Sequence, residues 1–237
     1  MFVTMALHPI LTAAAVIPAI ALMIYIYKKD RIEKEPSSLL FALVFEGIIS
    51  TAFAGLIEAI ASFYMDSSME QTSLAYLLIM NFIVVGGAEE GAKFYFLRKK
   101  TWRNANFNCQ FDGVVYAVFV SLGFALWENI GYVLLYGFNT ALVRAVTAVP
   151  GHCCFGVLMG AFYGFAKRYE DCGQYDKARR CLSLAVVVPV FTHGMYDFLA
   201  TVESAVYVGL FDFFVSCVFL VCFIMVKRLS DEDKYLR

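Results

Sequence analysis

Charged residues are scarce in this sequence of 237 residues. They make up 16% of the chain, whereas apolar residues make up 61%. Soluble domains carry about 25% charged and about 45–50% apolar residues, so a chain this short could not hide its apolar surface in a soluble core. The same scarcity excludes a disordered chain. A net charge of -1 also excludes the strongly basic surface that a nucleic-acid partner would require.

Long polar segments are also absent. The longest has about 15 residues, which is too short for a second folded domain, so we expect one integral-membrane domain over residues 1–237. Long apolar runs predict membrane-spanning helices, because the strands of a membrane barrel would be short and alternating. Seven such runs predict an all-α, polytopic helix bundle with spans at about 6–27, 38–64, 74–97, 111–136, 140–166, 182–201 and 204–226.

The positions of the Lys and Arg residues test this arrangement. All 19 of them except Lys93 and Arg144 lie after the first, third, fifth and seventh spans, and therefore in alternate connecting segments. By the positive-inside rule, this pattern predicts a multi-pass protein of the cell membrane with its N-terminus outside and its C-terminus in the cytoplasm. The first span has no cation before it, unlike a cleaved signal peptide, so we expect it to be retained.

Ionisable side chains inside the predicted spans are the most informative feature. Each one near the bilayer centre costs about 2.5–3.5 kcal/mol, so such groups persist by pairing, by facing water or by taking part in chemistry. Most of them fall in the third to sixth spans, which predicts one shared interior site. The full set is Glu46, Glu58, Glu89, Glu90, Lys93, Glu128, Arg144, His152, His193, Asp197 and Asp212.

The third span carries two adjacent acids and one base. Glu89 precedes Lys93 by four residues and Glu90 precedes it by three, so both carboxylates are within reach of the lysine on a helix. One lysine neutralises only one of the two acids, which leaves the other as a candidate general base or acid. A buried ion pair that only fixes helix packing is the alternative interpretation.

The next three spans add a glutamate and two histidines at a similar depth. At ~1.5 Å per residue, Glu128, His152 and His193 lie ~12–18 Å below the outer surface. Asn129 follows Glu128 and could hydrogen-bond nearby, while Asp197 lies one turn after His193 and can orient its imidazole. Glutamate and histidine at one level are residue types that bind a catalytic zinc ion or activate a water molecule without a metal.

At these residues the sequence resembles the PrsW family of intramembrane proteases, which shares a superfamily with the type II CAAX prenyl endopeptidases and their bacterial relatives. Prenyl endopeptidases would show EExxxR and FxxxH, whereas this chain has EExxK and FxxxE, which favours the PrsW branch. The charged loop at 30–36 and the segment Phe111–Gly113 are also similar. The motifs are EExxK (Glu89, Glu90, Lys93), FxxxE (Phe124, Glu128), a histidine in the next helix (His152) and HxxxD (His193, Asp197).

The resemblance implies an intramembrane endopeptidase of the bacterial inner membrane that cuts a single-span membrane protein near the outer face. The substrate of the family's namesake is an anti-sigma factor, so the cut would begin a signalling cascade. The partners implied are the protein substrate and lipid, and no oligomeric state is indicated. The implied catalytic residues are Glu89, Glu90, Lys93, Glu128, Asn129, His152, His193 and Asp197.

Two mechanisms are compatible with this resemblance. In one, Glu128, His152 and His193 hold a zinc ion, and one of the paired glutamates takes the proton from its water. In the other, which we favour, Glu89 activates water directly while the histidines and Asn129 stabilise the oxyanion. The sequence therefore does not establish a cofactor, and a zinc ion stays as the alternative.

Two other functions are compatible with the same buried charges. A proton-coupled transporter or channel also buries carboxylates and histidines, but it would usually show repeated halves or paired broken helices, and this sequence shows neither. A non-catalytic scaffold, like the multi-pass gamma-secretase subunit of the same superfamily, would need the glutamate pair for assembly rather than for activity. Glu46, Glu58, Arg144 and Asp212 are left as packing or gating charges without an assigned role.

Overall fold

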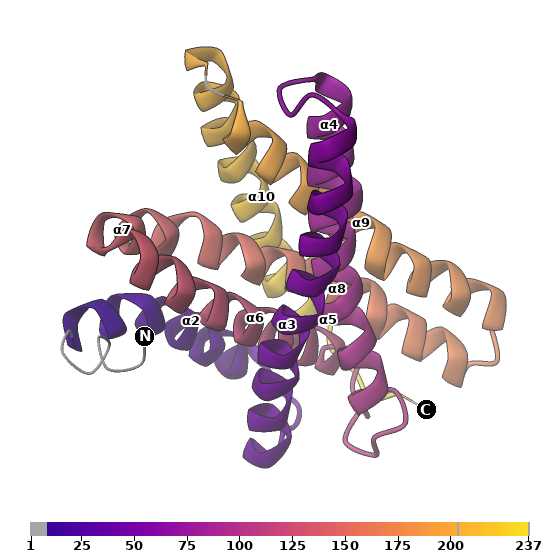
Figure 1. The fold of residues 1–237 in the computed structure, drawn as a ribbon. Coiled ribbons are helices and arrows are strands. Elements are labelled where there is room, and N and C mark those ends of the chain that lie inside the picture. The colour runs from indigo at the N-terminus through magenta and orange to yellow at the C-terminus, as the bar shows by residue number, and fades with distance from the viewer. Residues whose placement is uncertain (1–8, 203, 237) are drawn as a thin grey trace.

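The computed structural model of the protein describes residues 9–202 and 204–236, which form helices joined by short loops (Figure 1). Within those ranges the only β pairing is an isolated antiparallel bridge between Cys109 and Tyr235. In chain order the elements are α2 (Pro9–Lys29), α3 (Ser37–Ser68), α4 (Leu74–Leu78), the π-helix η1 (Ile79–Val85), α5 (Gly86–Thr101), α6 (Asp112–Tyr136), α7 (Phe138–Val146), α8 (Ala148–Asp171), α9 (Tyr175–Thr201) and α10 (Ala205–Asp231).

The described residues hold seven helical segments that are long and apolar enough to cross a membrane. Two of them are composite, because α4, η1 and α5 form one segment and α7 and α8 form another. The prediction of an all-α membrane bundle with seven spans is therefore confirmed. The sixth span begins at Tyr175 rather than near 182, because the polar residues that follow Tyr175 continue the helix beyond the apolar run. Residues 6–8 of the first predicted span lie outside the described residues, and the orientation of the termini stays a prediction.

The centre of the bundle lies where α6 packs between α3 and α8. The face of α8 that meets α6 carries a glycine at every fourth position, at Gly156, Gly160 and Gly164. A Cβ atom added at Gly160 would lie 2.5 Å from the carbonyl oxygen of Gly113 on α6, so only glycine allows the two backbones to approach this closely. This close approach brings the side chains of α6 and α8 into direct contact further along the same two helices.

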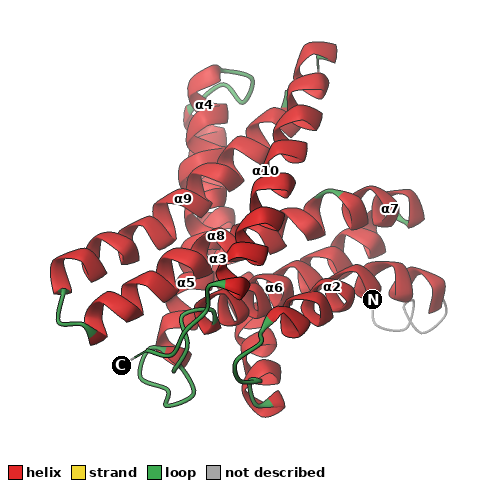
Figure 2. Cartoon of the chain, turned by 180° about the vertical axis from the view of Figure 1, so that it is seen from behind, coloured by secondary structure: helices red, strands yellow, loops and turns green. Residues whose placement is uncertain are grey.

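One end of the bundle is closed by a cap, which we define as residues 30–36, 102–111 and 231–236. In Figure 2 the loops of this cap gather beside the C-terminus, and the amide of Leu236 donates to the carbonyl of Asn108 at 2.6 Å. Asp30 and Glu35 are buried in the cap, and the Tyr116 hydroxyl donates to Glu35 at 2.8 Å. Burial raises the pKa of Asp30 to about 6 and the pKa of Glu35 to about 7.

Candidate active site

The start of α5 is shaped by an unusual backbone segment. The preceding π-helix η1 ends where the amide of Gly86 donates a hydrogen bond to the carbonyl of Asn81. π-Helical turns are rare in proteins, and those that occur are often found at functional sites. A Cβ atom at Gly86 would lie 3.0 Å from the carbonyl oxygen of Val190 on α9. Because α5 and α9 approach closely at this glycine, the acids one turn later on α5 lie against α9.

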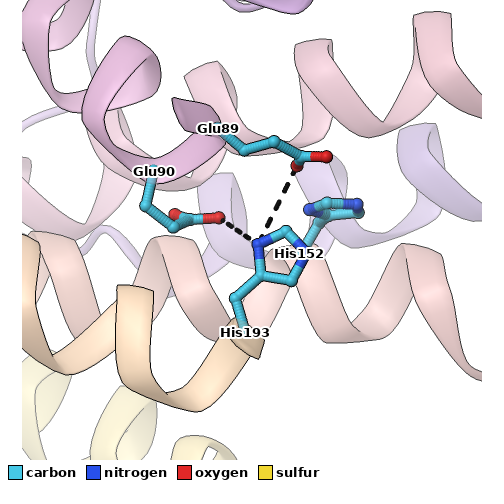
Figure 3. Close-up of side chains that lie close together, drawn as sticks. All are labelled: Glu89, Glu90, His152 and His193. Carbon is cyan, nitrogen blue, oxygen red and sulfur yellow. Dashed lines mark hydrogen bonds and ion pairs between the residues drawn. The ribbon is translucent and has the colours of Figure 1, made fainter. Parts of the chain in front are cut away.

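Four buried side chains from three helices meet inside the bundle (Figure 3). Glu89 and Glu90 come from α5, His152 comes from α8 and His193 comes from α9, and the candidate ligand atoms of all four lie within 4.8 Å of one another. We call these four residues the central group. Figure 3 shows the ring of His193 directed at both glutamates, with Nδ1 2.9 Å from Oε1 of Glu90 and 3.8 Å from Oε2 of Glu89.

Lys93 contacts three members of the central group. Its Nζ atom lies 2.7 Å from Oε1 of Glu90, 3.1 Å from Oε2 of Glu89 and 3.1 Å from Nδ1 of His152. The ammonium also lies 3.9 Å from the centroid of the Phe124 ring, where a cation is attracted to the aromatic face. One fully buried cation thus compensates two adjacent buried carboxylates, which would otherwise be costly in this setting.

Each imidazole has a carboxylate on its outer nitrogen. The Nε2 atom of His152 lies 2.9 Å from Oε2 of Glu128, and the Nε2 atom of His193 lies 3.3 Å from Oδ2 of Asp197. A carboxylate on one ring nitrogen fixes the orientation of the ring and the position of its proton. Both histidines therefore direct Nδ1 toward the middle of the site.

The inner neighbours distinguish the two histidines. Nδ1 of His152 faces the Lys93 ammonium, which only donates, so this nitrogen accepts and the ring proton is on Nε2. His193 faces carboxylates through both nitrogens, Glu90 on the inside and Asp197 on the outside. This environment matches an imidazolium whose Nδ1 hydrogen-bonds to Glu90 and whose Nε2 makes an ion-pair contact with Asp197.

A polar cavity of about 430 Å³ lies beside the central group, within the size range of ligand pockets, about 300–1,000 Å³. Glu89, His152 and His193 line it, whereas Glu90 and Lys93 do not. The two glutamates are therefore not equivalent. Glu89 faces the cavity, while Glu90 lies behind it with its charge held by Lys93 and His193.

The structure directs Asn129 away from the central group. Its side-chain amide donates to the carbonyl of Ala15 on α2 at 2.8 Å, and its oxygen accepts from Nε of Arg144 at 3.0 Å. Asn129 is fully buried and is not part of the cavity wall. Stabilisation of an oxyanion by Asn129 stays a prediction that this geometry does not favour.

Arg144 is the functional candidate that sequence reasoning left without a role. It lines the cavity, and Nη2 lies 2.9 Å from Oε2 of Glu128. The fifth span is not one continuous helix, because it is interrupted at Thr147 between α7 and α8. Pro150 falls in the first turn of α8, where a proline is tolerated. Counting residues along one continuous span could not locate this break. The available signal was the arginine itself, as a charge inside an apolar span.

The donor chemistry of the central group suits zinc. Zinc binds imidazole nitrogen and carboxylate oxygen, which are the ligand atoms that Glu89, Glu90, His152 and His193 bring together. This set differs from the predicted one, because Glu128 contacts His152 and Arg144 instead. The Lys93 ammonium contacts three of the four atoms that would bind the metal ion. It would have to move away from them before these residues could hold a metal.

The remaining charges inside the spans are not members of the central group. Glu46 forms an ion pair with Lys100 at 3.7 Å, which ties α3 to α5. Glu58 on α3 forms part of the cavity wall. Asp212 is exposed on α10. The structure therefore gives a packing role to Glu46 and leaves Asp212 outside the site.

Comparison with known proteins points to one family. A family model described as PrsW family intramembrane metalloprotease matches residues 34–226. Protease PrsW of Bacillus subtilis (strain 168) is 34% identical over 194 residues, which cover 81% of this chain and 83% of that protein. Protease PrsW of Clostridioides difficile (strain 630) is 32% identical over 193 residues, 80% of this chain and 78% of the relative. The protein of the same name from Geobacillus kaustophilus (strain HTA426) is 33% identical over 206 residues, 85% of each chain. No solved structure matches.

Proposed function

The chain belongs to the PrsW family of intramembrane metalloproteases, and from this premise we propose that it cuts a single-span membrane protein near the outer face of the membrane. Membership makes the chain a multi-pass membrane enzyme that hydrolyses peptide bonds, rather than a transporter or a scaffold. The observation that carries the proposal is the cavity walled by Glu89, His152 and His193. An anti-sigma factor is the substrate that we propose to test first.

In this proposal Glu89 is the general base. A base must come within about 2.6–3.2 Å of the group whose proton it takes, and Glu89 is the member of the glutamate pair that reaches the cavity. It would take a proton from water, and the resulting hydroxide would attack the scissile carbonyl carbon. The same proton would then pass to the departing amine, which restores the carboxylate. Glu90 and Lys93 hold Glu89 and His193 in place from behind.

His193 is suited to stabilise the oxyanion. It lines the cavity, and its carboxylate neighbours Glu90 and Asp197 match a doubly protonated ring. Both ring nitrogens face carboxylates, so the ring would act through its positive charge and not by donating a hydrogen bond to the oxyanion. Such a charge is worth more in a site of low dielectric than in water. His152, held by Glu128 and Lys93, would position the water or the peptide from the opposite wall.

A metal ion would supply a different activation of the same water. Zinc held by Glu89, Glu90, His152 and His193 would act as a Lewis acid toward the carbonyl oxygen and the attacking water. We favour direct activation of water by Glu89, because the Lys93 ammonium already contacts the candidate metal-ligand atoms of Glu89, Glu90 and His152.

The position of the cavity supports a cut near one face. Its wall extends to Tyr132, in the last turns of α6, and to Thr201, the last residue of α9. In the predicted orientation both helices end at the outer surface. A substrate chain could therefore reach Glu89 from the outer half of the bilayer without crossing it.

The position of the cut tests this proposal. The purified protein would be reconstituted in lipid vesicles with a single-span anti-sigma factor, and the fragments would be identified by mass spectrometry. We expect one cut near the outer boundary of the substrate span. A cut on the cytoplasmic side, or an intact substrate, would contradict the proposal. Asp212→Asn provides a matched carboxylate-to-amide control on α10, outside the cavity.

A further inference from the structure

We propose that Arg144 is a positioning residue of this active site, which fixes the ring of His152 by holding Glu128. The inference rests on the proposed function, because it assigns Arg144 to the same reaction. Within the described chain, Arg144 forms its ion pair with Glu128 and its side-chain hydrogen bond with Asn129, and neither residue belongs to the central group. Arg144 also lines the cavity, so the experiment must separate an effect that passes through Glu128 from a direct contact with the substrate.

Arg144 reaches the site from α7, which lies beside α2 and α6 (Figure 1). Its Nη2 atom lies 2.9 Å from Oε2 of Glu128, and its Nε atom donates to Oδ1 of Asn129 at 3.0 Å. The guanidinium carbon lies 4.0 Å from the centroid of the Tyr132 ring. All three partners belong to the last turns of α6, so one side chain of α7 fastens the segment that carries Glu128.

A single oxygen atom connects Arg144 to His152. Oε2 of Glu128 lies 2.9 Å from Nη2 of Arg144 and 2.9 Å from Nε2 of His152. The guanidinium and the carboxylate form an ion pair in a site that is largely removed from water, and this pairing fixes the position of Oε2 beside Nε2 of His152. As an acceptor, Glu128 holds the ring proton of His152 on Nε2 and leaves the lone pair of Nδ1 directed at Lys93.

Loss of Arg144 should therefore change His152 before it changes anything else in the site. Glu128 would lose the contact that fixes its rotamer, and His152 would lose the fixed acceptor on Nε2. The proton would stay on Nε2, because the Lys93 ammonium still faces Nδ1, but the orientation of the ring would no longer be fixed from its outer side. Outer partners of functional histidines typically contribute 10–100-fold to activity, and Arg144 would contribute through such a partner.

A purely structural role for Arg144 makes a different prediction. The α7 helix also packs against α2 through Ala141 and Ala15, and Asn129 joins Arg144 to the same part of α2. If Arg144 only held α7 in place, its loss would reduce activity whether or not Glu128 were intact. A positioning role acts only through Glu128, so the two roles are separable.

A double-mutant cycle tests the inference. The variants are Arg144→Gln, Glu128→Gln and the double substitution, all purified in the same lipid system. We expect each single substitution to lower kcat about 10–100-fold with KM within about twofold, and the double variant to be no slower than Glu128→Gln alone. Multiplied losses in the double variant would overturn the inference. Val143→Ala, next to Arg144 with an exposed side chain, is the control that should retain wild-type activity.

The protonation of His152 provides an independent readout. The sequence has only three histidines, so nitrogen NMR of histidine-labelled protein gives few signals, and His152→Gln assigns one of them. In the wild type we expect a proton on Nε2 of His152 and none on Nδ1. In Arg144→Gln we expect the proton to stay on Nε2, because Lys93 still faces Nδ1, while the Nε2 signal moves and broadens as its contact with Glu128 loosens and the His193 signal stays unchanged. An unaltered His152 signal in Arg144→Gln would also overturn the inference. Failure of the proposed function would be seen separately, as a cut at the wrong face by the wild-type protein.

Discussion

The Nε2 atom of His152 lies 2.9 Å from the Oε2 atom of Glu128. This contact joins α8 to α6 on the cavity wall and gives Glu128 a partner within the site. A histidine whose outer nitrogen is fixed in this way presents its inner nitrogen in one orientation. The contact depends on the close approach of α6 and α8, on the ion pair of Glu128 with Arg144 and on the buried Lys93 beside His152. Each of these three features can be altered separately.

The glycines of α8 should control this contact from a distance. A Cβ atom at Gly160 would lie 2.5 Å from backbone atoms of Gly113 and Val114 on α6. We expect Gly160→Ala to lower the free energy of unfolding by about 1–3 kcal/mol, because it overpacks the interface, and to reduce cleavage as α6 and α8 separate. Thermal unfolding in detergent measures the first effect. Gly131→Ala, where an added Cβ would meet no atom within 4 Å, should lower neither property, since alanine is favoured over glycine inside a helix. Equal losses in the two variants would contradict this explanation.

Lys93 should compete with a metal ion for the central group. Its ammonium contacts Glu89, Glu90 and His152, so an incoming cation would have to displace it against like-charge repulsion. We expect Lys93→Met to bind zinc at least about tenfold more tightly than the wild type, a change of about 1.4 kcal/mol, as measured by titration calorimetry. Lys99→Met removes an exposed charge from the same helix and serves as the control. Equal zinc affinity in Lys93→Met and the wild type would show that the ammonium does not occupy the metal position.

Chelation tests whether the reaction uses a metal at all. Because the proposal makes Glu89 the base, we expect the purified enzyme to keep its cleavage rate after prolonged treatment with a zinc chelator. Metal analysis of the same sample would establish that zinc had been removed. Loss of cleavage on chelation, with recovery after zinc is added back, would instead favour the zinc mechanism through Glu89, Glu90, His152 and His193.

The cap should make stability depend on pH. The raised pKa values of Asp30, about 6, and Glu35, about 7, mean that the folded protein holds these protons more tightly than the unfolded chain, whose values are near 4. The stabilisation is complete below about pH 4 and is lost as the pH rises through about 6 to 7. We expect Asp30→Asn and Glu35→Gln to flatten the decline in melting temperature over this range. A slope equal to that of the wild type in both variants would contradict the assignment.

The orientation of the chain can be tested with a cysteine that it already carries. Cys172 is exposed between α8 and α9, a connection that the positive-inside rule places in the cytoplasm. A membrane-impermeant maleimide should label Cys172 in inside-out vesicles and not in intact cells, with Cys172→Ser as the background. Labelling in intact cells would reverse the predicted orientation and would place the cavity mouth on the other face.

Local features of the site could be predicted because they follow from spacing along one helix. Glu89 and Glu90 lie within reach of Lys93 in any helix with that sequence. The seven spans were predictable for a similar reason, since each contains a long apolar run. The contact of Glu90 with His193, which are 103 residues apart, depends instead on how α5 packs against α9, and the motifs alone indicated only that the two residues belong to one site.

Features that depend on breaks and packing could not be predicted. Helix α7 ends at Val146 and α8 begins at Ala148, and Arg144 of α7 pairs with Glu128 of α6. No periodicity within an apolar run indicates such a break. Asn129 was expected to face the site because it follows Glu128, but adjacent helical residues point in different directions. Its side chain faces α2 instead. The unequal exposure of Glu89 and Glu90 to the cavity likewise required the structure.

The cleavage rate of Glu89→Gln tests the central claim most directly. Under single-turnover conditions with saturating substrate in vesicles, the amide cannot take a proton from water, so we expect a loss of about 10²–10⁴-fold, the contribution of a general base. The protein should keep the wild-type melting temperature within a few degrees, and Asp212→Asn should cleave at the wild-type rate. Cleavage by folded Glu89→Gln within about threefold of the wild-type rate would contradict the assignment of Glu89 as the residue that activates water.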